Sequence, residues 1–355
     1  MIAAQQRPGK SAHLGTVPLA PTRFVVNSDR MQKADLVLEG GGVKGIGLVG
    51  AVMRLADAGW TFPRVAGTSA GAIVAALIAA LQTADRPMND LRQLMDTIDY
   101  PSFMTGDWKE RHLGKVGAAI DLFEHEGIYD GKYLVDWLGG ALEEIGVTTF
   151  GQLKMDDPKS SLAESQRYSL IVHTADISRK KLVRLPWDYP EYGVGVDETR
   201  IVDAVRASMS IPFFFTPVRF HAAASNDGTD NFAAGPVTWV DGGLLSNFPV
   251  EVFDRSDGLP SRWPTIGVKL SALSPTPIAP SSPDNPVDEA LACLRTALDN
   301  ASRYYLLPDK AKRTVFVDSF GIAATDFQLT KADQDKLFAS GSAAATSYLA
   351  GRQPA

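Results

Sequence analysis

The chain has 355 residues, of which 45% are hydrophobic and 21% are charged, a composition typical of globular proteins and a length that suits one large α/β domain or two small ones. Its net charge of −6 argues against a nucleic-acid partner and against electrostatic recruitment to anionic membranes. A single cysteine, Cys293, excludes an internal disulfide framework and a cysteine-rich metal site, so we expect a cytoplasmic protein.

Residues 1–34 contain no long apolar region of the kind found in signal peptides, and we interpret them as a mobile tail. No uninterrupted apolar run reaches the roughly 18 residues of a membrane-spanning helix. We therefore expect no transmembrane segment, and secretion by a route without a cleaved signal stays open.

The first predicted strand, residues 35–39, and the first predicted helix, residues 46–58, are joined by a glycine-rich turn. Glycines allow backbone N–H groups to converge on one point, and such a nest at a helix N-terminus binds a full or developing negative charge. Lys44 beside it is either an anchor for a phosphate or carboxylate or a solvated lysine. The turn consists of Gly40, Gly41, Gly42, Val43, Lys44 and Gly45.

The same turn also spells G-x-G-x-x-G, the pattern of a dinucleotide-binding site. That site requires an acidic residue at the end of the second strand, where this chain has Gly67-Thr68-Ser69. A phosphate-binding P-loop does not fit either, because Lys44 is not followed by Ser or Thr. The sequence therefore favours a turn that stabilises a developing oxyanion.

Ser69 lies between a predicted strand that ends at residues 65–67 and a predicted buried helix at residues 70–81. Gly67 and Gly71 remove the Cβ atoms that would clash in a tight strand-to-helix turn. This G-x-S-x-G arrangement is a nucleophile elbow, which exposes the serine Oγ at the positive end of a helix.

Residues 85–127 contain Pro, Met and aromatic residues that interrupt the helical period. We interpret them as a helical insertion with a partly buried aromatic face, or alternatively as a lid or a wall for an acyl chain. Because the net charge disfavours anionic membranes, we expect any membrane contact to be apolar and to use Phe103, Met104 and Trp108.

The remaining elements are predicted from periodicity and turn residues. Residues 221–235 are expected to form a polar loop, and residues 274–286 a Pro/Ser-rich linker. The last helix is predicted to begin at Thr330, with Asp333 completing its cap. The predicted strands are 168–174, 181–185, 237–240 and 265–270, and the predicted helices are 132–145, 200–208, 287–307 and 331–349.

A serine nucleophile usually needs a histidine base, but no histidine follows His221 in this chain. Asp241 instead ends an apolar strand and is followed by Gly242 and Gly243. We expect its carboxylate at the carboxyl edge of the sheet, where the elbow serine would also emerge. On its own, an Asp-Gly pair would more often be a structural turn.

Together, the turns GGGVKG, GTSAG and DGG, in this order, resemble the three signatures of the patatin-like phospholipase family. Residues 204–217 are similar to a helix and following strand of that family, and residues 127–131 to its turn before a helix. The resemblance covers roughly residues 35–350 and is specific as a set. We therefore expect residues 35–350 to form a single catalytic domain.

The resemblance implies a three-layer α/β/α fold with a mostly parallel central sheet and hydrolysis of acyl esters of phospholipids or related lipids. It implies Ser69 as nucleophile, Asp241 as base without histidine, and the turn Gly40–Gly45 as oxyanion hole. Gly67, Gly71, Gly242 and Gly243 would support these motifs. It implies no cofactor and no metal, a lipid substrate, and transient contact with a membrane surface or micelle.

Two alternatives stay open at this point. An acyltransferase of related architecture would normally need a histidine base near the site. A catalytically idle lipid-binding effector module would have no physical need to retain both Ser69 and Asp241. The 222–235 stretch before Asp241 departs from the family pattern, which affects the expected substrate and not the expected dyad.

Overall fold

The computed structural model describes residues 32–104, 129–226, 231–255, 257–271 and 308–351, together with residues 289, 292, 293 and 296. Three predicted segments lie wholly or partly outside the described residues. They are the N-terminal tail up to residue 31, residues 105–127 of the 85–127 insertion, which include Trp108, and the 274–286 linker. Most of the predicted helix at 287–307 also lies outside them.

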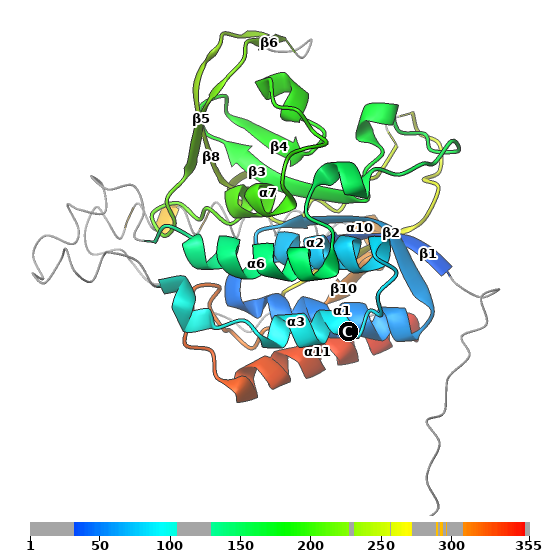
Figure 1. Ribbon diagram of the computed structural model, residues 1–355. Helices are drawn as coiled ribbons and strands as arrows, with labels where there is room; N and C mark the ends of the chain where they lie inside the picture. The colour runs from blue at the N-terminus through cyan, green and yellow to red at the C-terminus, as the bar shows by residue number, and fades with distance from the viewer. Residues whose placement is uncertain are drawn as a thin grey trace, which may run out of the picture.

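Strands and helices alternate through the first half of the chain and are followed by an antiparallel region (Figure 1). The strands are β1 (Gln32–Leu38), β2 (Trp60–Thr68), β3 (Leu170–Asp176), β4 (Lys181–Leu185), β5 (Val218–Ala222), β6 (Ser225–Asn226), β7 (Asn231–Phe232), β8 (Gly235–Asp241), β9 (Thr265–Lys269) and β10 (Thr314–Phe316). The helices are α1 (Gly45–Asp57), α2 (Ala70–Thr83), α3 (Asp90–Asp96), α6 (Lys132–Ile145), α7 (Ile201–Ser208), α8 (Gly243–Ser246), α10 (Pro308–Lys312) and α11 (Lys331–Leu349). Short 3₁₀ segments occur at Gly42–Lys44, Tyr100–Met104, Phe150–Leu153, Glu164–Gln166 and Tyr189–Tyr192.

One central sheet organises the molecule, with the strand order β10-β9-β1-β2-β3-β8-β5 and β4 paired with β3. The pairs from β10 to β3 are parallel, whereas β4, β8 and β5 are joined by antiparallel pairing. The sheet is therefore mixed and mostly parallel. This confirms the predicted α/β fold class with a mostly parallel central sheet.

The central strands are buried on both faces, as expected for parallel strands covered on both sides. Leu36 and Val65 point into the larger core, which includes α1 and α2, while Val37 and Ala66 point into a smaller core around Phe248. Figure 1 shows α1, α2, α3, α6 and α11 gathered on one side of the sheet. We call this side the helix face.

Helix α2 is the most deeply placed of these helices. Every residue from Ala70 to Leu81 is buried, because this helix is apolar around its whole circumference and packs against the sheet as well as α3, α6 and α7. Its position holds Ser69, the residue immediately before it, in a buried position.

Helices α1 and α11 pack closely through small residues. A Cβ atom on Gly50 would lie 2.0 Å from the carbonyl oxygen of Phe338, and one on Gly341 would lie 2.0 Å from that of Gly47. Helix α11 has the predicted bounds, and Thr330 caps it by accepting a hydrogen bond from the Asp333 N–H at 3.2 Å. The C-terminal helix is thus part of the same core as the glycine-rich turn.

The expected polar loop at 221–235 is wrong for most of its described residues, and residues 227–230 lie outside the described part of the chain. Strand β5 pairs with β8 from Val218 opposite Trp239 to Ala222 opposite Gly235, and β6 pairs with β7 beyond them. Hydrophobic alternation did not predict these strands, because their side chains are mostly small or polar. The strands form because pairing across the hairpin satisfies the hydrogen bonds of their backbone groups.

Candidate active site

Ser69 occupies a strained backbone position between β2 and α2. Its φ of 53° and ψ of −125° lie in a region that non-glycine residues rarely adopt. A Cβ atom on Gly67 would lie 2.2 Å from the carbonyl oxygen of Gly71, and one on Gly71 would lie 2.4 Å from that of Leu38. Both glycines are required for the turn, which has the sharp strand-to-helix geometry expected from the sequence.

Ser208, the last residue of α7, holds the backbone of this turn. The N–H of Ser69 donates a hydrogen bond to the Oγ of Ser208 at 2.8 Å, and that Oγ donates to the carbonyl oxygen of His173 at 2.5 Å. Ser208 is fully buried. The sequence analysis missed this residue, although a serine at the end of an apolar helix that resembles a family motif was a possible signal.

Asp241 reaches the serine at the end of an antiparallel strand. β8 runs antiparallel to β3, yet Asp241 lies at the carboxyl edge of the parallel strands, as expected. It lies opposite Thr174, while Thr68 at the end of β2 lies opposite the neighbouring His173. Strand β8 first pairs with β3 at Asp176, the last residue of β3, and runs back as far as Thr174. Its last residue, Asp241, therefore lies level with Ser69.

The Asp241 carboxyl group is almost fully buried, with 2% of the residue exposed. Its Oδ1 accepts a hydrogen bond from the N–H of Gly243 at 2.7 Å, whereas its Oδ2 has no partner within the part of the chain that the structure describes. Burial raises the pKa of Asp241 from 3.8 to about 7, and the Gly243 N–H and the nearby Ser69 hydroxyl only partly oppose this rise. The group can therefore gain or lose a proton near neutral pH.

The Ser69 hydroxyl is close enough to Asp241 to lower its pKa, but its hydrogen-bond geometry favours another partner. Its Oγ lies 3.4 Å from the Sδ of Met209, a weak acceptor. A thioether competes poorly with a carboxylate for a hydroxyl proton. The Asp241 carboxylate is therefore a stronger nearby acceptor for the Ser69 hydroxyl than the Met209 sulfur that it contacts in this structure.

The glycine-rich turn is fixed at both ends by residues from distant parts of the chain. The N–H of Gly40 donates to the carbonyl oxygen of Asn247 at 3.0 Å, and the Nδ2 of Asn247 donates back to the carbonyl oxygen of Gly40 at 3.0 Å. The N–H of Val43 donates to the carbonyl oxygen of Ala324 at 3.0 Å. Asn247 therefore couples the segment that follows Asp241 to the glycine-rich turn.

Only some of the amides in this turn remain available. The N–H groups of Lys44 and Gly45 donate to carbonyl oxygens within the turn. Those of Gly41 and Gly42 have no hydrogen-bond partner among the described residues. The sequence predicted the whole turn as an oxyanion hole, whereas the structure leaves only the adjacent N–H groups of Gly41 and Gly42 as candidate donors among the described residues.

The Glu39 carboxylate precedes this turn and forms a buried ion pair with Lys269. Glu39 also accepts the N–H of Leu270 at 2.5 Å. A Cβ atom on Gly41 would lie 2.3 Å from the Cδ1 of Leu270. The residues at the end of β9 therefore pack against the glycine-rich turn and hold it in place.

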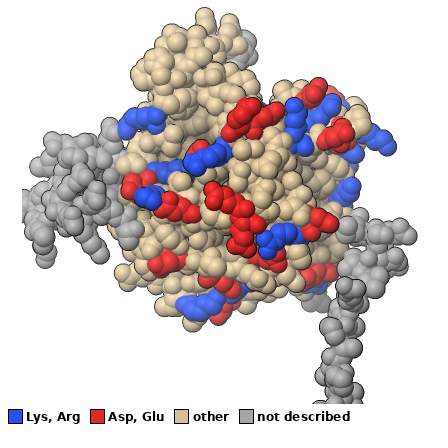
Figure 2. All heavy atoms as spheres, in the orientation of Figure 1, with Lys and Arg blue, Asp and Glu red and all other residues tan. Residues whose placement is uncertain are grey.

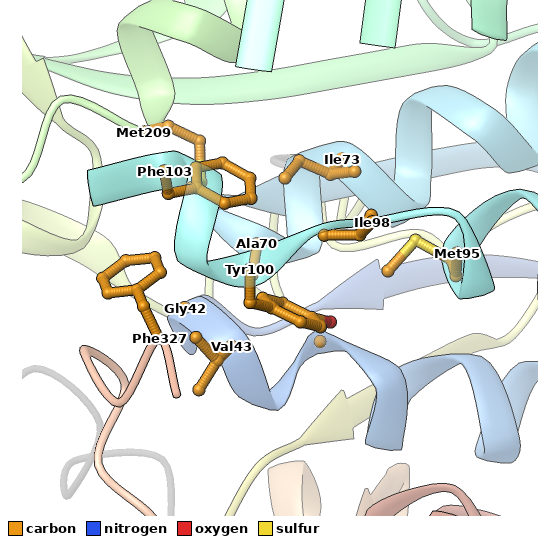
Figure 3. Close-up of a pocket in the computed structure, with 11 residues that line it drawn as sticks. Gly42, Val43, Ala70, Ile73, Met95, Ile98, Tyr100, Phe103, Met209 and Phe327 are labelled. Carbon is orange, nitrogen blue, oxygen red and sulfur yellow. The ribbon is translucent and has the colours of Figure 1, made fainter. Parts of the chain in front are cut away.

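A narrow pocket of about 330 Å³, including space open to solvent, adjoins Gly42 and Ala70 (Figure 3). It lies between the glycine-rich turn, the start of α2 and the segment that follows α3. Its lining is apolar, as in most ligand sites. The side chains that form most of its wall are Ile73, Met95, Ile98, Phe103, Met209 and Phe327.

The burial of Phe103 contradicts its expected contact with a membrane, but its packing agrees with the expected aromatic face. With 4% of the residue exposed, it cannot contact a membrane in this conformation, so the predicted membrane-facing role of this side chain is wrong. Its ring packs against Tyr133 with centroids 4.9 Å apart and against Phe327 at 5.7 Å. The predicted partly buried aromatic face is present here, whereas Trp108 lies outside the described residues.

Neither of the two described histidines, His173 and His221, is placed to act as a base for Ser69. His173 is fully buried, and burial lowers its pKa to about 4. Side chains alternate between the two faces along a strand, so the His173 side chain lies on the same face of the sheet as Ile171. Asp241 and Trp239 lie on the opposite face, the helix face. His221 is exposed on β5, opposite Pro236 and five residues from Asp241 along β8. His13, His112 and His125 lie outside the described residues.

Metal-ion clusters and membrane-spanning helices are both absent from the part of the chain that the structure describes. Within the described ranges, no group of three or more His, Cys, Asp or Glu side chains could hold a metal ion. None of the helices in those ranges is both long enough and apolar enough to span a bilayer. Figure 2 shows acidic and basic side chains interspersed over α3, α6 and α11, where Arg92 pairs with Asp96 and Asp335.

Comparison with known proteins identifies the family. A sequence model described as patatin-like phospholipase matches residues 36–254, a range that contains the glycine-rich turn, Ser69 and Asp241. The chain belongs to this family. Membership in the patatin-like phospholipase family supports a lipid hydrolase activity.

This patatin-like chain also resembles individual proteins. It is 32% identical over 301 residues to the uncharacterized protein YqhO of Bacillus subtilis (strain 168), which covers 84% of this chain and 91% of YqhO. Among solved structures, VipD from Legionella pneumophila is 16% identical with a TM-score of 0.48, covering 91% of this chain and 67% of VipD. ExoU in its heterodimeric complex with SpcU from Pseudomonas aeruginosa is 18% identical with a TM-score of 0.44, covering 92% of this chain and 53% of ExoU.

Proposed function

We propose that the chain is a serine hydrolase that cleaves acyl ester bonds of phospholipids or related lipids, with Ser69 as nucleophile and Asp241 as base. One observation carries the proposal: a buried carboxyl group with an unpartnered Oδ2 lies beside a serine on a strained strand-to-helix turn. Leaving a buried carboxylate oxygen without a partner is unfavourable, and such groups concentrate at functional sites.

In the first step, the Asp241 carboxylate accepts the proton of the Ser69 hydroxyl while Oγ attacks the carbonyl carbon of the ester. A carboxyl group with a pKa of about 7 is a better base than an ordinary aspartate, because the proton transfer is more nearly balanced. The same carboxyl group then donates its proton to the departing alcohol oxygen. The carbon–oxygen bond of the ester breaks and leaves an acyl group on Ser69.

The carbonyl oxygen acquires negative charge in this step. The adjacent amides of Gly41 and Gly42 are available to donate hydrogen bonds to it, as is the positive end of α2. Each well-placed donor in such a site lowers the barrier by about 3 kcal/mol. Because Asn247 and Ala324 hold the two ends of the turn, these donors are fixed before substrate binds.

In the second step, Asp241 accepts a proton from water, the hydroxide oxygen attacks the acyl carbon, and the bond to Ser69 Oγ breaks. Asp241 returns the proton to Ser69, and the fatty acid leaves. The apolar side chains around the narrow pocket beside Ala70 and Gly42 offer a surface against which the acyl chain can pack during both steps. An acyl chain with its carbonyl at Ser69 suits a lipid substrate presented by a membrane or a micelle.

The test uses a fluorophosphonate probe, which forms a covalent adduct with an activated serine. We expect labelling of the natural chain and of Ser165→Ala, which alters an exposed serine, and none of Ser69→Ala. Hydrolysis of phospholipid in mixed micelles should fall by a factor on the order of 10³ or more in Ser69→Ala. Retention of most of the activity in that variant would show that the nucleophile is a different group. Transfer of the acyl group to an added alcohol in preference to water would indicate an acyltransferase instead.

A further inference from the structure

The Gly41 N–H, one of the two available amides of the glycine-rich turn, belongs to the peptide group that joins Gly40 to Gly41. This peptide group is trans, and in a trans peptide the C=O and the N–H point in opposite directions. Whatever holds the Gly40 carbonyl therefore also sets the direction of the Gly41 N–H. The peptide group lies beside the nucleophile, because a Cβ atom on Gly40 would lie 3.1 Å from the Cβ of Ser69.

Asn247 holds the Gly40 carbonyl. Its Nδ2 donates a hydrogen bond to the Gly40 carbonyl oxygen at 3.0 Å, and its own backbone carbonyl accepts the Gly40 N–H at 3.0 Å. The side chain fits closely against the turn, since a Cβ atom on Gly40 would lie 2.2 Å from the Oδ1 of Asn247. The two hydrogen bonds involve the peptide groups on either side of Gly40, so the orientation of both is fixed.

Asn247 is itself held against the turn that carries the nucleophile. The Oγ1 of Thr68, the residue before Ser69, donates to the carbonyl oxygen of Ser246 at 3.2 Å. Thr68 is fully buried, and so is Phe248, the residue after Asn247. The end of β2 and the core therefore set the position of Asn247, and its side-chain amide connects the serine turn to the glycine-rich turn.

The second available amide is oriented by the backbone. The Gly42 N–H belongs to the peptide group whose carbonyl, that of Gly41, accepts the N–H of Lys44 at 3.2 Å. No side chain takes part in that hydrogen bond, so it does not depend on the identity of a side chain. The direction of the Gly41 N–H, in contrast, depends on the amide of Asn247.

We propose that Asn247 is a positioning residue that directs the Gly41 N–H toward the oxyanion formed at the ester carbonyl. This inference rests on the proposed function, because it assigns the Gly41 N–H to an ester bound at Ser69. Without the Asn247 amide, the peptide group between Gly40 and Gly41 can rotate, and its N–H loses its fixed direction. The loss should affect kcat more than KM, since the negative charge on the oxygen develops in the transition state.

The experiment compares Asn247→Ala and Asn247→Asp on p-nitrophenyl butyrate and on its thiono analogue, in which sulfur replaces the carbonyl oxygen. Alanine removes the amide, and an aspartate carboxylate keeps its size but cannot donate. Sulfur is a weak hydrogen-bond acceptor, so the thionoester gains little from an oxyanion donor. In both variants we expect kcat for the oxygen ester to fall about 10²-fold with KM little changed.

The ratio of kcat/KM for the oxygen ester over the thionoester should fall about tenfold in both variants. This ratio is independent of the fraction of active enzyme, so partial loss of folding does not obscure it. A purely structural role for Asn247 would lower kcat/KM for the two esters equally and leave the ratio unchanged.

Leu245 offers a control in α8, two residues before Asn247. It is 45% exposed, and Leu245→Ala should leave both kcat and the ratio unchanged. If the Asn247 variants keep the natural ratio, whether or not their activity falls, the inference is overturned while the proposed function stands. If hydrolysis of p-nitrophenyl butyrate persists in Ser69→Ala, the proposed function fails first.

Discussion

Replacing Asp241 by Asn should stabilise the protein near neutral pH while abolishing its activity. Burial raises the pKa of Asp241 from 3.8 to about 7, so the folded state binds this proton more tightly than the unfolded state does. The free energy of unfolding therefore falls as pH rises from about 4 to about 7, and it stays low above that range. A pKa rise of about 3 units corresponds to a loss of about 4 kcal/mol.

Asparagine is neutral at every pH, so it avoids this loss. Its Oδ1 can still accept the N–H of Gly243, and its Nδ2 can donate to the Ser69 hydroxyl. The difference in unfolding free energy between Asp241→Asn and the natural chain should become more favourable to the variant by about 4 kcal/mol between pH 4 and pH 8. Urea denaturation at a series of pH values measures this difference.

Ser69→Ala is the control, because it removes activity but keeps the titrating carboxyl group. Its stability should depend on pH as steeply as that of the natural chain. A stability difference for Asp241→Asn that is constant across the pH range would refute the reasoning. The natural enzyme's kcat/KM should also fall about tenfold for each pH unit below an apparent pKa near 7, since Asp241 acts in its charged form.

Five further substitutions test the surroundings of the site. Ser208→Ala leaves one buried N–H and one buried C=O without partners, so we expect unfolding free energy to fall by about 1–3 kcal/mol for each and kcat to fall with KM little changed; an unchanged kcat would contradict this. Lys269→Met should lower the free energy of unfolding by about 3–5 kcal/mol, because it leaves Glu39 buried without its ion-pair partner. Adding Glu39→Gln should restore part of the lost stability. If urea denaturation shows that the effects of the two substitutions add, the ion pair does not stabilise the protein. His221→Gln should retain full activity, and His173→Gln should lower stability without altering the pH profile of kcat/KM; a loss as large as that of Ser69→Ala would indicate a histidine base.

Local pattern in the sequence determined much of this protein. Gly67 and Gly71 predicted the turn at Ser69, because a strained turn excludes side chains wherever the chain folds around it. Apolar periodicity predicted α6 with its observed bounds, since a helix must bury one stripe of residues, and the Thr330–Asp333 cap predicted where α11 begins. These features depend on residues close together in the chain, so the sequence displays them directly.

Contacts between distant segments were decided only by the tertiary structure. The sequence placed Asp241 at the end of a strand, but only strand pairing showed that β8 is antiparallel and ends beside Thr174. In the same way, Asn247 and Ala324 take up two amides of the glycine-rich turn and leave those of Gly41 and Gly42 available. Whether a backbone amide is free depends on which carbonyl packs against it, and residues hundreds of positions apart carry no periodic signal of that contact.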